Sequence, residues 1–376
     1  MAALRDGRRG RRLGTMQWLR GQLRRRPRPL WVLCVAHVLA LGIALVLYAL
    51  PHHVIPHGEA SIGVTSTRGG RAAAAQAVLQ EETEAPADPA EEAAEAEQTP
   101  VPTAQPTPEP TQDPASVGDF RDKFAGMFTS GDVNITETSY QSPNLNIQVN
   151  KLYNEAAGAW SYVADIYIAD ISCLQTAFGK DTYGRGYTEW ITRLAERYQS
   201  VVTLNGDYYG TRDTGVVIRN GTLYRDNKTT NDIAILYWDG HMEVFSADSF
   251  DAMTEIDRGA YQSWCFGPSL LDEAGNQVQV FNCGYSLIRK NPRSAIGYYE
   301  PGHYCFVAVD GRNDDSKGIR MSQLADFMHD LGCTLAYNLD GGQTSLLAFG
   351  NQLVNDPSDG GRSSSDYIMI VDRIEE

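Results

Sequence analysis

Short runs of alternating apolar and polar residues fill the last two thirds of the chain, and this period of two predicts β-strands. Residues 162–171 (YVADIYIADI) alternate as a half-buried strand does, and residues 201–209 (VVTLNGDYY) predict a buried strand that runs into a loop. Asn220-Gly221 and Asp239-Gly240 each stand between two apolar runs and predict two β-hairpins. Further strands are expected within 303–312, 334–342 and 365–374.

Apolar residues recur at helical spacing in two segments, 187–199 and 322–333. Ser322 is expected to cap the second helix, and Gly332 stands just beyond its end. The strands, hairpins and few helices together predict an α+β fold. We expect mixed β-sheets with hairpins and a few packed helices, in a single domain that spans residues 120–376.

The N-terminal part contains one long apolar stretch, residues 30–50, which only His37 interrupts. About 20 apolar residues are enough to span a bilayer as a helix. Residues 1–29 are rich in Arg, and such a basic tail stays in the cytoplasm. We therefore expect a single-pass transmembrane signal anchor at 30–50, with the C-terminal domain outside the cell. A cleaved signal peptide is the alternative, and it would also export the rest of the chain.

Residues 51–119 differ in composition from the domain that follows. They are dominated by Ala, Glu, Pro and Thr, as in EETEAPADPAEEAAEAEQTPVPT. A segment with so few large apolar residues cannot bury enough surface to offset its chain entropy. The sequence therefore predicts a disordered, partly extended stalk that holds the domain away from the membrane.

The charge of the chain is unevenly distributed. Residues 1–30 have a balance of +9 and residues 51–119 one of −10, which leaves −14 for residues 120–376 out of a total of −15. A domain with that balance lacks the basic surface that binds nucleic-acid backbones non-specifically, so no nucleic-acid partner is expected.

Cysteine and histidine positions exclude several enzyme classes. Five cysteines follow the apolar stretch, and none has C-x-x-C or zinc-ligand spacing. No two histidines have H-E-x-x-H spacing. We therefore expect neither a zinc hydrolase nor a His-based triad. The cysteines are interpreted as small buried residues, with room for one disulfide.

Three predicted strands end in polar loops that contain glycine: TLNGDYYG, VAVDGR and YNLDGGQTS. Their carboxylates are Asp207, Asp310 and Asp340. One such loop is adequately explained by turn formation, but three on the same kind of strand favour a functional site. Arginines flank these loops, and because a guanidinium group suits phosphate they suggest a local anion site. They are Arg293, Arg312 and Arg362.

The order of these blocks resembles the phosphodiester glycosidase family, which includes the enzyme that removes N-acetylglucosamine from lysosomal enzymes. The resemblance covers residues 200–375 and comprises LNGDYY, PRSAIG, VAVDGR with a helix after it, NLDGG, and an Arg before the last strand. Two positions depart from the family pattern. Asp207 stands where a second Gly is common, and Gln343 replaces a third Gly after NLDGG, so that Thr344 falls on the usual Ser.

The resemblance implies hydrolysis of a sugar-1-phosphodiester at its glycosidic bond. It ranks Asp310 and Asp340 first as catalytic carboxylates, with Asp207 third. The remaining candidates would bind the phosphate and the sugar: Asn205, Arg293, Arg312, Asn338, Gly341, Gly342, Thr344 and Arg362. The expected partners are a carbohydrate phosphodiester substrate and, through residues 30–50, the membrane.

Two other functions are compatible with the residues. An exported domain on a stalk could bind envelope glycans without cleaving them. Alternatively, Asp207, Asp310 and Asp340 could ligate Mg²⁺ or Ca²⁺ in a metal-dependent phosphodiesterase that cuts the P–O bond. The glycosidase hypothesis requires no cofactor.

Overall fold

The computed structural model describes residues 30–49, 57–68 and 117–372. The chain divides into two units, Met1–Ile55 and Pro56–Glu376. The first contains the helix α2 (Leu30–Ala49), which coincides with the predicted apolar helix. Within the described ranges, no helix is long and apolar enough to cross a membrane. The membrane anchor at residues 30–50 stays a prediction.

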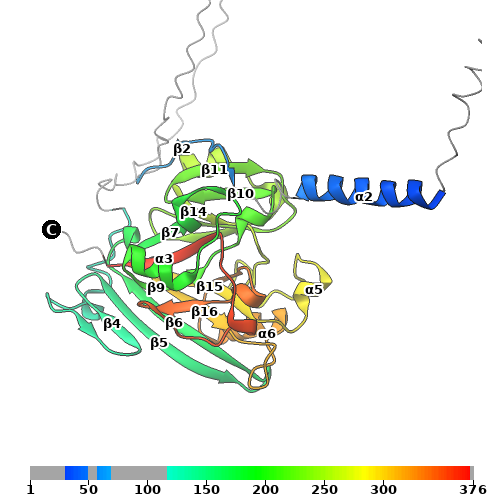
Figure 1. Ribbon diagram of the computed structural model, residues 1–376. Helices are drawn as coiled ribbons and strands as arrows, with labels where there is room; N and C mark the ends of the chain where they lie inside the picture. The colour runs from blue at the N-terminus through cyan, green and yellow to red at the C-terminus, as the bar shows by residue number, and fades with distance from the viewer. Residues whose placement is uncertain (1–29, 50–56, 69–116, 373–376) are drawn as a thin grey trace, which may run out of the picture. The chain divides into compact units, whose positions relative to one another are not determined.

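The second unit is built mainly of β-strands, with few helices, as the α+β prediction requires (Figure 1). Its α-helices are α3 (Ile191–Tyr198), α4 (Ala252–Asp257), α5 (Tyr285–Ile288) and α6 (Met321–Asp330). Its strands are β1 (His57–Gly58), β2 (Val64–Thr65), β3 (Asn134–Ile135), β4 (Ser139–Gln141), β5 (Leu145–Asn154), β6 (Ala159–Ile168), β7 (Leu174–Phe178), β8 (Gly184–Arg185), β9 (Ser200–Asn205), β10 (Gly215–Arg219), β11 (Thr222–Asn227), β12 (Ile233–Tyr237), β13 (Met242–Phe245), β14 (Ala260–Trp264), β15 (Arg293–Glu300), β16 (His303–Val309), β17 (Leu335–Asn338), β18 (Leu347–Phe349), β19 (Gln352–Leu353) and β20 (Asp366–Val371).

Two large sheets form the centre of this unit. One has the strand order β17-β15-β16-β6-β5-β4-β3, and the other has the order β19-β18-β9-β20-β7. Three smaller sheets follow the orders β10-β11-β2, β13-β12-β14 and β1-β8. Every strand pairing among the described residues is antiparallel. The predicted mixed pairing was therefore wrong, because short hairpins join many of the strands and parallel pairs need longer crossovers.

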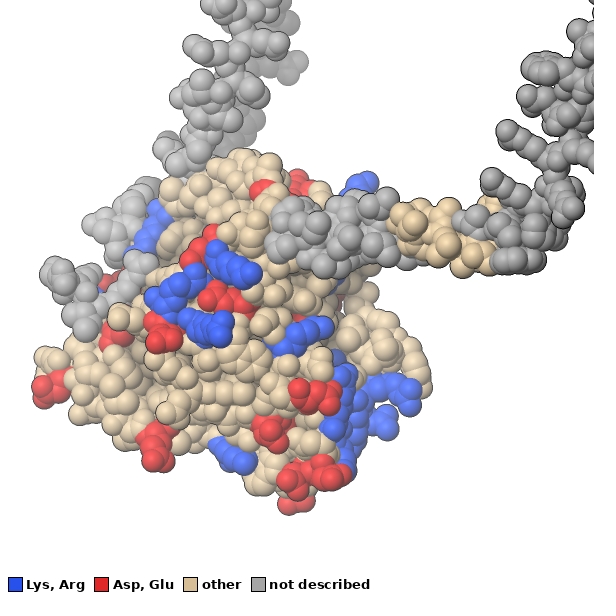
Figure 2. Space-filling model, in the orientation of Figure 1, with Lys and Arg blue, Asp and Glu red and all other residues tan. Residues whose placement is uncertain are grey.

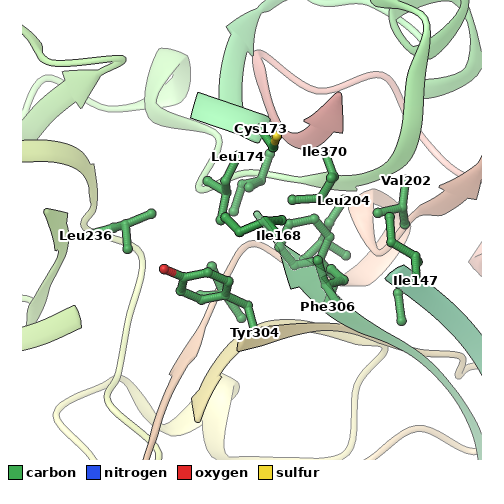
Figure 3. Packing of buried hydrophobic residues seen from close by; sticks show 14 of the residues in the cluster. Ile147, Ile168, Cys173, Leu174, Val202, Leu204, Leu236, Tyr304, Phe306 and Ile370 are labelled. Carbon is green, nitrogen blue, oxygen red and sulfur yellow. The ribbon is translucent and has the colours of Figure 1, made fainter. Parts of the chain in front are cut away.

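The main hydrophobic core lies between the two large sheets. Figure 3 shows Ile147 and Phe306 of the first sheet packed with Val202, Leu204 and Ile370 of the second. The opposite face of the seven-stranded sheet is covered by α6, and the opposite face of the five-stranded sheet by α3. The central strands β6 and β16 are therefore buried on both faces, more than the half-buried alternation read from the sequence predicts.

The predicted hairpins and helices are present. Asn220 and Gly221 both have positive φ (49° and 82°), as the type I′ turn between β10 and β11 requires. Asp239-Gly240 joins β12 to β13. The cap of α6 was misplaced by two residues: Arg320 rather than Ser322 is the N-cap.

Part of the segment predicted to be a disordered stalk is folded. Residues 57–68 lie in the domain, where β1 pairs with β8 and β2 pairs with β11. Arg68 also forms an ion pair with Asp170. The composition of 51–119 as a whole concealed this short segment, in which Val64 and Thr65 add a strand beside β11. Residues 69–116 lie outside the described residues.

Strand pairing brings together the strand ends from which the polar loops start. β17 pairs with β15, and β15 pairs with β16, so the ends of β16 and β17 flank the start of β15. In the other sheet the end of β9 lies beside the start of β20. The two edges are joined where the Asp340 amide donates to the Gly206 carbonyl (3.3 Å).

Candidate active site

Asp340 lies at the junction of these strand ends, two residues beyond β17. The Thr344 hydroxyl donates to its carboxylate, and Arg362 Nη2 lies 3.4 Å from the same oxygen, Oδ2. Arg362 also donates to the Thr344 hydroxyl (3.1 Å). Burial raises the pKa of the Asp340 carboxyl, and the Thr344 hydrogen bond and the charges of Arg362 and Arg212 only partly offset that effect.

Two arginines near this carboxylate, Arg362 and Arg212, are held by contacts with aromatic rings and a backbone carbonyl. Arg362 lies over the Tyr208 ring, 4.7 Å from its centroid. Arg212 donates to the Asp207 carbonyl (2.7 Å) and lies over the Phe266 ring at 5.2 Å. Tyr208 has a left-handed backbone (φ 52°), a strained conformation for a bulky residue. Arg362 thus contacts the Asp340 carboxylate, and Arg212 is near enough for its charge to favour the ionised form.

Asp207 does not face this site. Its carboxylate accepts from Arg219 Nη2 (3.0 Å) and from the Cys265 amide (2.9 Å), and it is 1% exposed. Arg219 Nη2 also lies 2.8 Å from Asp366 Oδ2, so one buried guanidinium joins two buried carboxylates. We call Asp207, Arg219 and Asp366 the buried ion cluster.

The two carboxylates of the buried ion cluster have opposite pKa shifts. Burial favours the neutral form of Asp207, but Arg219 and Arg212 outweigh it and lower the pKa of that carboxyl. Burial and the charge of Asp207 raise the pKa of Asp366 to about 6. Asp366 also accepts from the Tyr208 amide (2.9 Å). The buried ion cluster thus holds in place the residue whose ring supports Arg362.

Asp310 follows β16 and is 2% exposed. Its carboxylate accepts from Asn355 Nδ2 (2.8 Å) and from the Asp356 amide (3.1 Å). Asn355 Nδ2 also donates to the Ser345 carbonyl (2.9 Å). Burial raises the pKa of Asp310. Asp310 therefore reaches the Asp340 loop through Asn355 rather than by direct contact.

The two asparagines predicted to bind sugar are fully buried. Asn205 accepts from the Ser294 hydroxyl (2.6 Å) and donates to the Asp340 carbonyl (2.8 Å), so it fastens β9 to the Asp340 loop. Asn338 donates to the Gly267 carbonyl (2.7 Å), and its Oδ1 has no hydrogen-bond partner among the described residues. Both ends of the Asn205 side-chain amide are therefore occupied by hydrogen bonds within the protein.

The other predicted residues lie around the Asp340 loop. The Gly342 amide donates to the Pro292 carbonyl (3.0 Å), and a Cβ on Gly341 would come within 2.7 Å of that carbonyl. The Arg312 guanidinium lies beside Gly342 and donates to Asn291 Oδ1 (2.8 Å). Arg293 instead points to the Leu287 and Arg289 carbonyls, and burial lowers its pKa to about 10.

The predicted residues therefore fall into two sets. Asp340, Thr344 and Arg362 are in mutual contact, with Arg312 close to the same loop. Asp207, Asp310, Asn205 and Arg293 are bound within the protein. Among the described residues, no group of three or more His, Cys, Asp or Glu side chains is arranged to hold a metal ion.

Sequence reasoning missed Arg212, Tyr208, Arg219, Asp366 and Asn355. Tyr208 and Arg212 stand in or just after the block LNGDYYGTR, so an inspection of that loop beyond its Asp could have found them. Arg219 precedes a hairpin turn and resembles an exposed residue. Its partners in the buried ion cluster are 12 and 147 residues away along the chain.

Comparison with known proteins agrees with the sequence blocks. The family model for phosphodiester glycosidases matches residues 198–371, which confirms the resemblance. A curated relative is the SPbeta prophage-derived uncharacterized protein YomE of Bacillus subtilis (strain 168), 32% identical over 186 residues. The match covers 47% of this chain and 29% of YomE, so the chain spans under a third of that relative's length.

Three solved structures are also similar. The catalytic domain of zebrafish N-acetylglucosamine-1-phosphodiester alpha-N-acetylglucosaminidase, auto-inhibited by its pro-peptide, is 21% identical with a TM-score of 0.49, over 64% of this chain and 88% of that one. A hypothetical protein from Synechocystis is 14% identical with a TM-score of 0.47, over 64% of each chain. A putative exported protein from Burkholderia pseudomallei K96243 is 15% identical with a TM-score of 0.43, over 57% of this chain and 74% of that one.

Proposed function

We propose that the phosphodiester glycosidase domain at residues 198–371 hydrolyses a sugar-1-phosphodiester at the glycosidic C–O bond. The family supports hydrolysis of phosphodiester-linked sugars in general. The observation that supports the finer proposal is the contact of the Asp340 carboxylate with Arg362 and Thr344, with the charge of Arg212 nearby. A carboxylate beside anion-binding groups is what C–O cleavage of a phosphodiester requires.

The arginines would bind the diester. A phosphodiester carries one negative charge, which the Asp340 carboxylate would repel on its own. Arg362 is 44% exposed at its side chain and forms only a 3.4 Å contact with Asp340, so its guanidinium has donors left for a phosphate oxygen. Arg312 is exposed beside Gly342 and can contribute a second cation.

Asp340 would act at the sugar C1. In the proposed step Asp340 accepts a proton from a water molecule, whose oxygen forms a bond to C1. The C1–O bond breaks, and its electron pair leaves with the phosphate. The products are a reducing sugar and a phosphate monoester. Because phosphate is already a good leaving group, the oxocarbenium-like transition state needs less acid assistance than that of an ordinary glycoside.

Asp310 and Asp207 would position this machinery rather than touch the substrate. Asp340 is 8% exposed, whereas Asp310 and Asp207 are 2% and 1% exposed and accept from protein donors. The exposure ranks Asp340 first among the three carboxylates. Asp310 then orders the loop through Asn355, and Asp207 orders Tyr208 and Arg212 through the buried ion cluster.

The test compares Asp340→Asn with a matched control on a panel of sugar-1-phosphodiesters. Asp314→Asn is the control, since its carboxylate is fully exposed and pairs with the exposed Lys317. We expect Asp340→Asn to lower turnover by at least about a thousandfold (~4 kcal/mol) while substrate still binds, and Asp314→Asn to retain wild-type activity. Hydrolysis in ¹⁸O-labelled water locates the broken bond. Label in the sugar hydroxyl supports the proposal, whereas label in the phosphate, with loss of activity in chelator, would establish a metal-dependent phosphodiesterase instead.

We also propose that the domain is exported from the cytoplasm. This proposal rests on the sequence alone, because an apolar stretch after an Arg-rich tail directs export whether or not it is later cleaved. A fusion of residues 1–68 to a reporter enzyme that folds only outside the cytoplasm would be active if the proposal is right. An inactive but stable fusion would contradict it.

A further inference from the structure

A basic cleft of about 710 Å³ lies between α5, the segment after it and the first residue before α6. Its lining includes Arg289, Lys290 and Arg320, and no carboxylate among the described residues. Figure 2 shows Lys and Arg side chains gathered at the lower right of the domain, on the side of α5 and α6. In a domain whose balance is −14, these three cations give the cleft a local positive charge.

The cations of this cleft remain available to a ligand. Lys290 Nζ donates to the Ala157 carbonyl, and Arg289 lies 5.8 Å from the Tyr285 ring centroid. No carboxylate within the described residues forms an ion pair with Arg289, Lys290 or Arg320. Burying part of a phosphate group here would therefore add charge-assisted hydrogen bonds without first breaking an ion pair.

The basic cleft shares a wall with the candidate active site. Asn291 lines the cleft and accepts from Arg312, whose guanidinium lies beside Gly342. The next residue, Pro292, accepts from the Gly342 amide. One continuous segment thus faces the cleft and holds the Asp340 loop, so a ligand that extends beyond the reacting phosphate along this segment meets the basic cleft next.

The cleft also has exposed apolar side chains, and its volume is large enough for a sugar. Tyr285 is 75% exposed and Ile288 is 37% exposed, and both belong to the lining. Aromatic rings provide amphipathic contact area for ligands that are part apolar and part polar. Ligand clefts of 300–1,000 Å³ hold molecules larger than one monosaccharide. A cleft of this volume can accept a sugar unit together with its phosphate.

We propose that the basic cleft binds a second phosphate of the substrate, so that the preferred substrate is an oligomeric sugar phosphate in which phosphodiesters recur along the chain. This inference rests on the proposed function, because it extends the same site. The cleft is concave and its cations converge on one hollow, which favours a chain-like anion over a flat lipid surface. The acidic balance of the domain disfavours nucleic acid.

The experiment compares a substrate with one phosphodiester, a methyl glycosyl-phosphate, with a trimer of the same unit. The test variant is Arg289→Gln/Arg320→Gln, which leaves Lys290 and its hydrogen bond in place. The control is Arg193→Gln/Lys228→Gln, which removes two exposed cations on other elements, α3 and the segment after β11. For the test variant we expect kcat/KM on the trimer to fall about tenfold, as two partly exposed charge contacts of ~0.7 kcal/mol each would give. Activity on the single diester should not change.

The wild-type preference for the trimer should also shrink as salt is raised, because partly exposed charge contacts are screened. Equal kcat/KM for trimer and single diester in the wild type, or equal loss on both in the test variant, would refute the basic cleft as a second phosphate site. So would an oligonucleotide or anionic vesicles competing as well as the trimer does.

Trimer binding to Asp340→Asn, measured by calorimetry, separates this inference from the proposed function. If the wild type cleaves neither substrate, the proposed function fails, but tenfold weaker trimer binding upon the Arg289/Arg320 changes would still support the cleft. Unchanged binding would reject it independently of turnover.

Discussion

Removing Arg219 tests how the buried ion cluster supports the site, because Arg219 is the cation that contacts both buried carboxylates. Its Nη2 lies 3.0 Å from Asp207 Oδ1 and 2.8 Å from Asp366 Oδ2, so these two oxygens are no more than about 6 Å apart. At an effective dielectric constant of ~20, two like charges at that distance repel by about 3 kcal/mol. Breaking a buried ion pair on one side costs about 3–5 kcal/mol in measured cases. We expect Arg219→Met to lower the free energy of unfolding by that amount.

Arg225→Met is the matched control. Arg225 is also a buried arginine, on the next strand, but it donates to backbone carbonyls such as those of Gly215 and Arg212. Its loss leaves unpaired carbonyls rather than uncompensated charge, which costs about 1–3 kcal/mol. Urea unfolding at pH 7.5 measures both. Adding Asp207→Asn and Asp366→Asn to Arg219→Met should recover part of the loss, since neutral groups no longer need the cation.

The pH dependence of the free energy of unfolding distinguishes a lost ion pair from a loss of packing. Without Arg219 the folded-state pKa values of Asp207 and Asp366 both rise, so the variant's folded state binds protons more readily than the unfolded state as pH falls toward 5. The stability difference between wild type and Arg219→Met should therefore shrink between pH 7.5 and 5. In the wild type, the raised pKa of Asp366, about 6, makes its contribution to stability decrease as pH rises from about 4 to 6. A loss equal to that of Arg225→Met and constant with pH would refute the reasoning.

Three further predictions concern single contacts. Thr344→Val removes the hydroxyl that donates to Asp340, so kcat/KM should fall about tenfold (~1.5 kcal/mol), and an unchanged rate would contradict the role of this hydrogen bond. Gly206→Ala would place a Cβ 2.1 Å from Asp366 Oδ2, so it should destabilise the fold by about 1–3 kcal/mol in urea, and a neutral result would contradict that packing. Cys305 and Cys333, whose sulfurs are 3.7 Å apart, should form a disulfide on refolding with oxidised glutathione, which takes up the two electrons and two protons. Peptide mapping without reductant tests this, and two alkylatable thiols would contradict it.

Much of the fold follows from local sequence patterns. Asn220-Gly221 specifies its hairpin by the two positive φ angles that the turn needs, and the helical spacing of 187–199 and 322–333 yields α3 and α6. What the patterns do not contain is strand order. The pairing of β16 with β6, whose paired residues are 136 to 148 positions apart, depends on which apolar faces meet in the core, and no short motif encodes that choice.

The different roles of the three carboxylates could not be predicted from the sequence, for the same reason. Asp207, Asp310 and Asp340 each follow a buried strand, so their local contexts are alike. Their environments are set by distant residues: Arg219 and Asp366 for Asp207, Asn355 for Asp310, and Arg362 for Asp340.

Antiparallel pairing explains why these partners meet. The end of β9 lies beside the start of β20, and β9 ends just before Asp207 while β20 begins with Asp366. Two acids at that position would repel each other, and Arg219 at the end of β10 supplies the compensating charge. The same junction orients the Tyr208 amide, and the Tyr208 ring lies under Arg362. The buried ion cluster therefore fixes the cation that faces Asp340, which is why its energetics and the chemistry of the proposed site should change together.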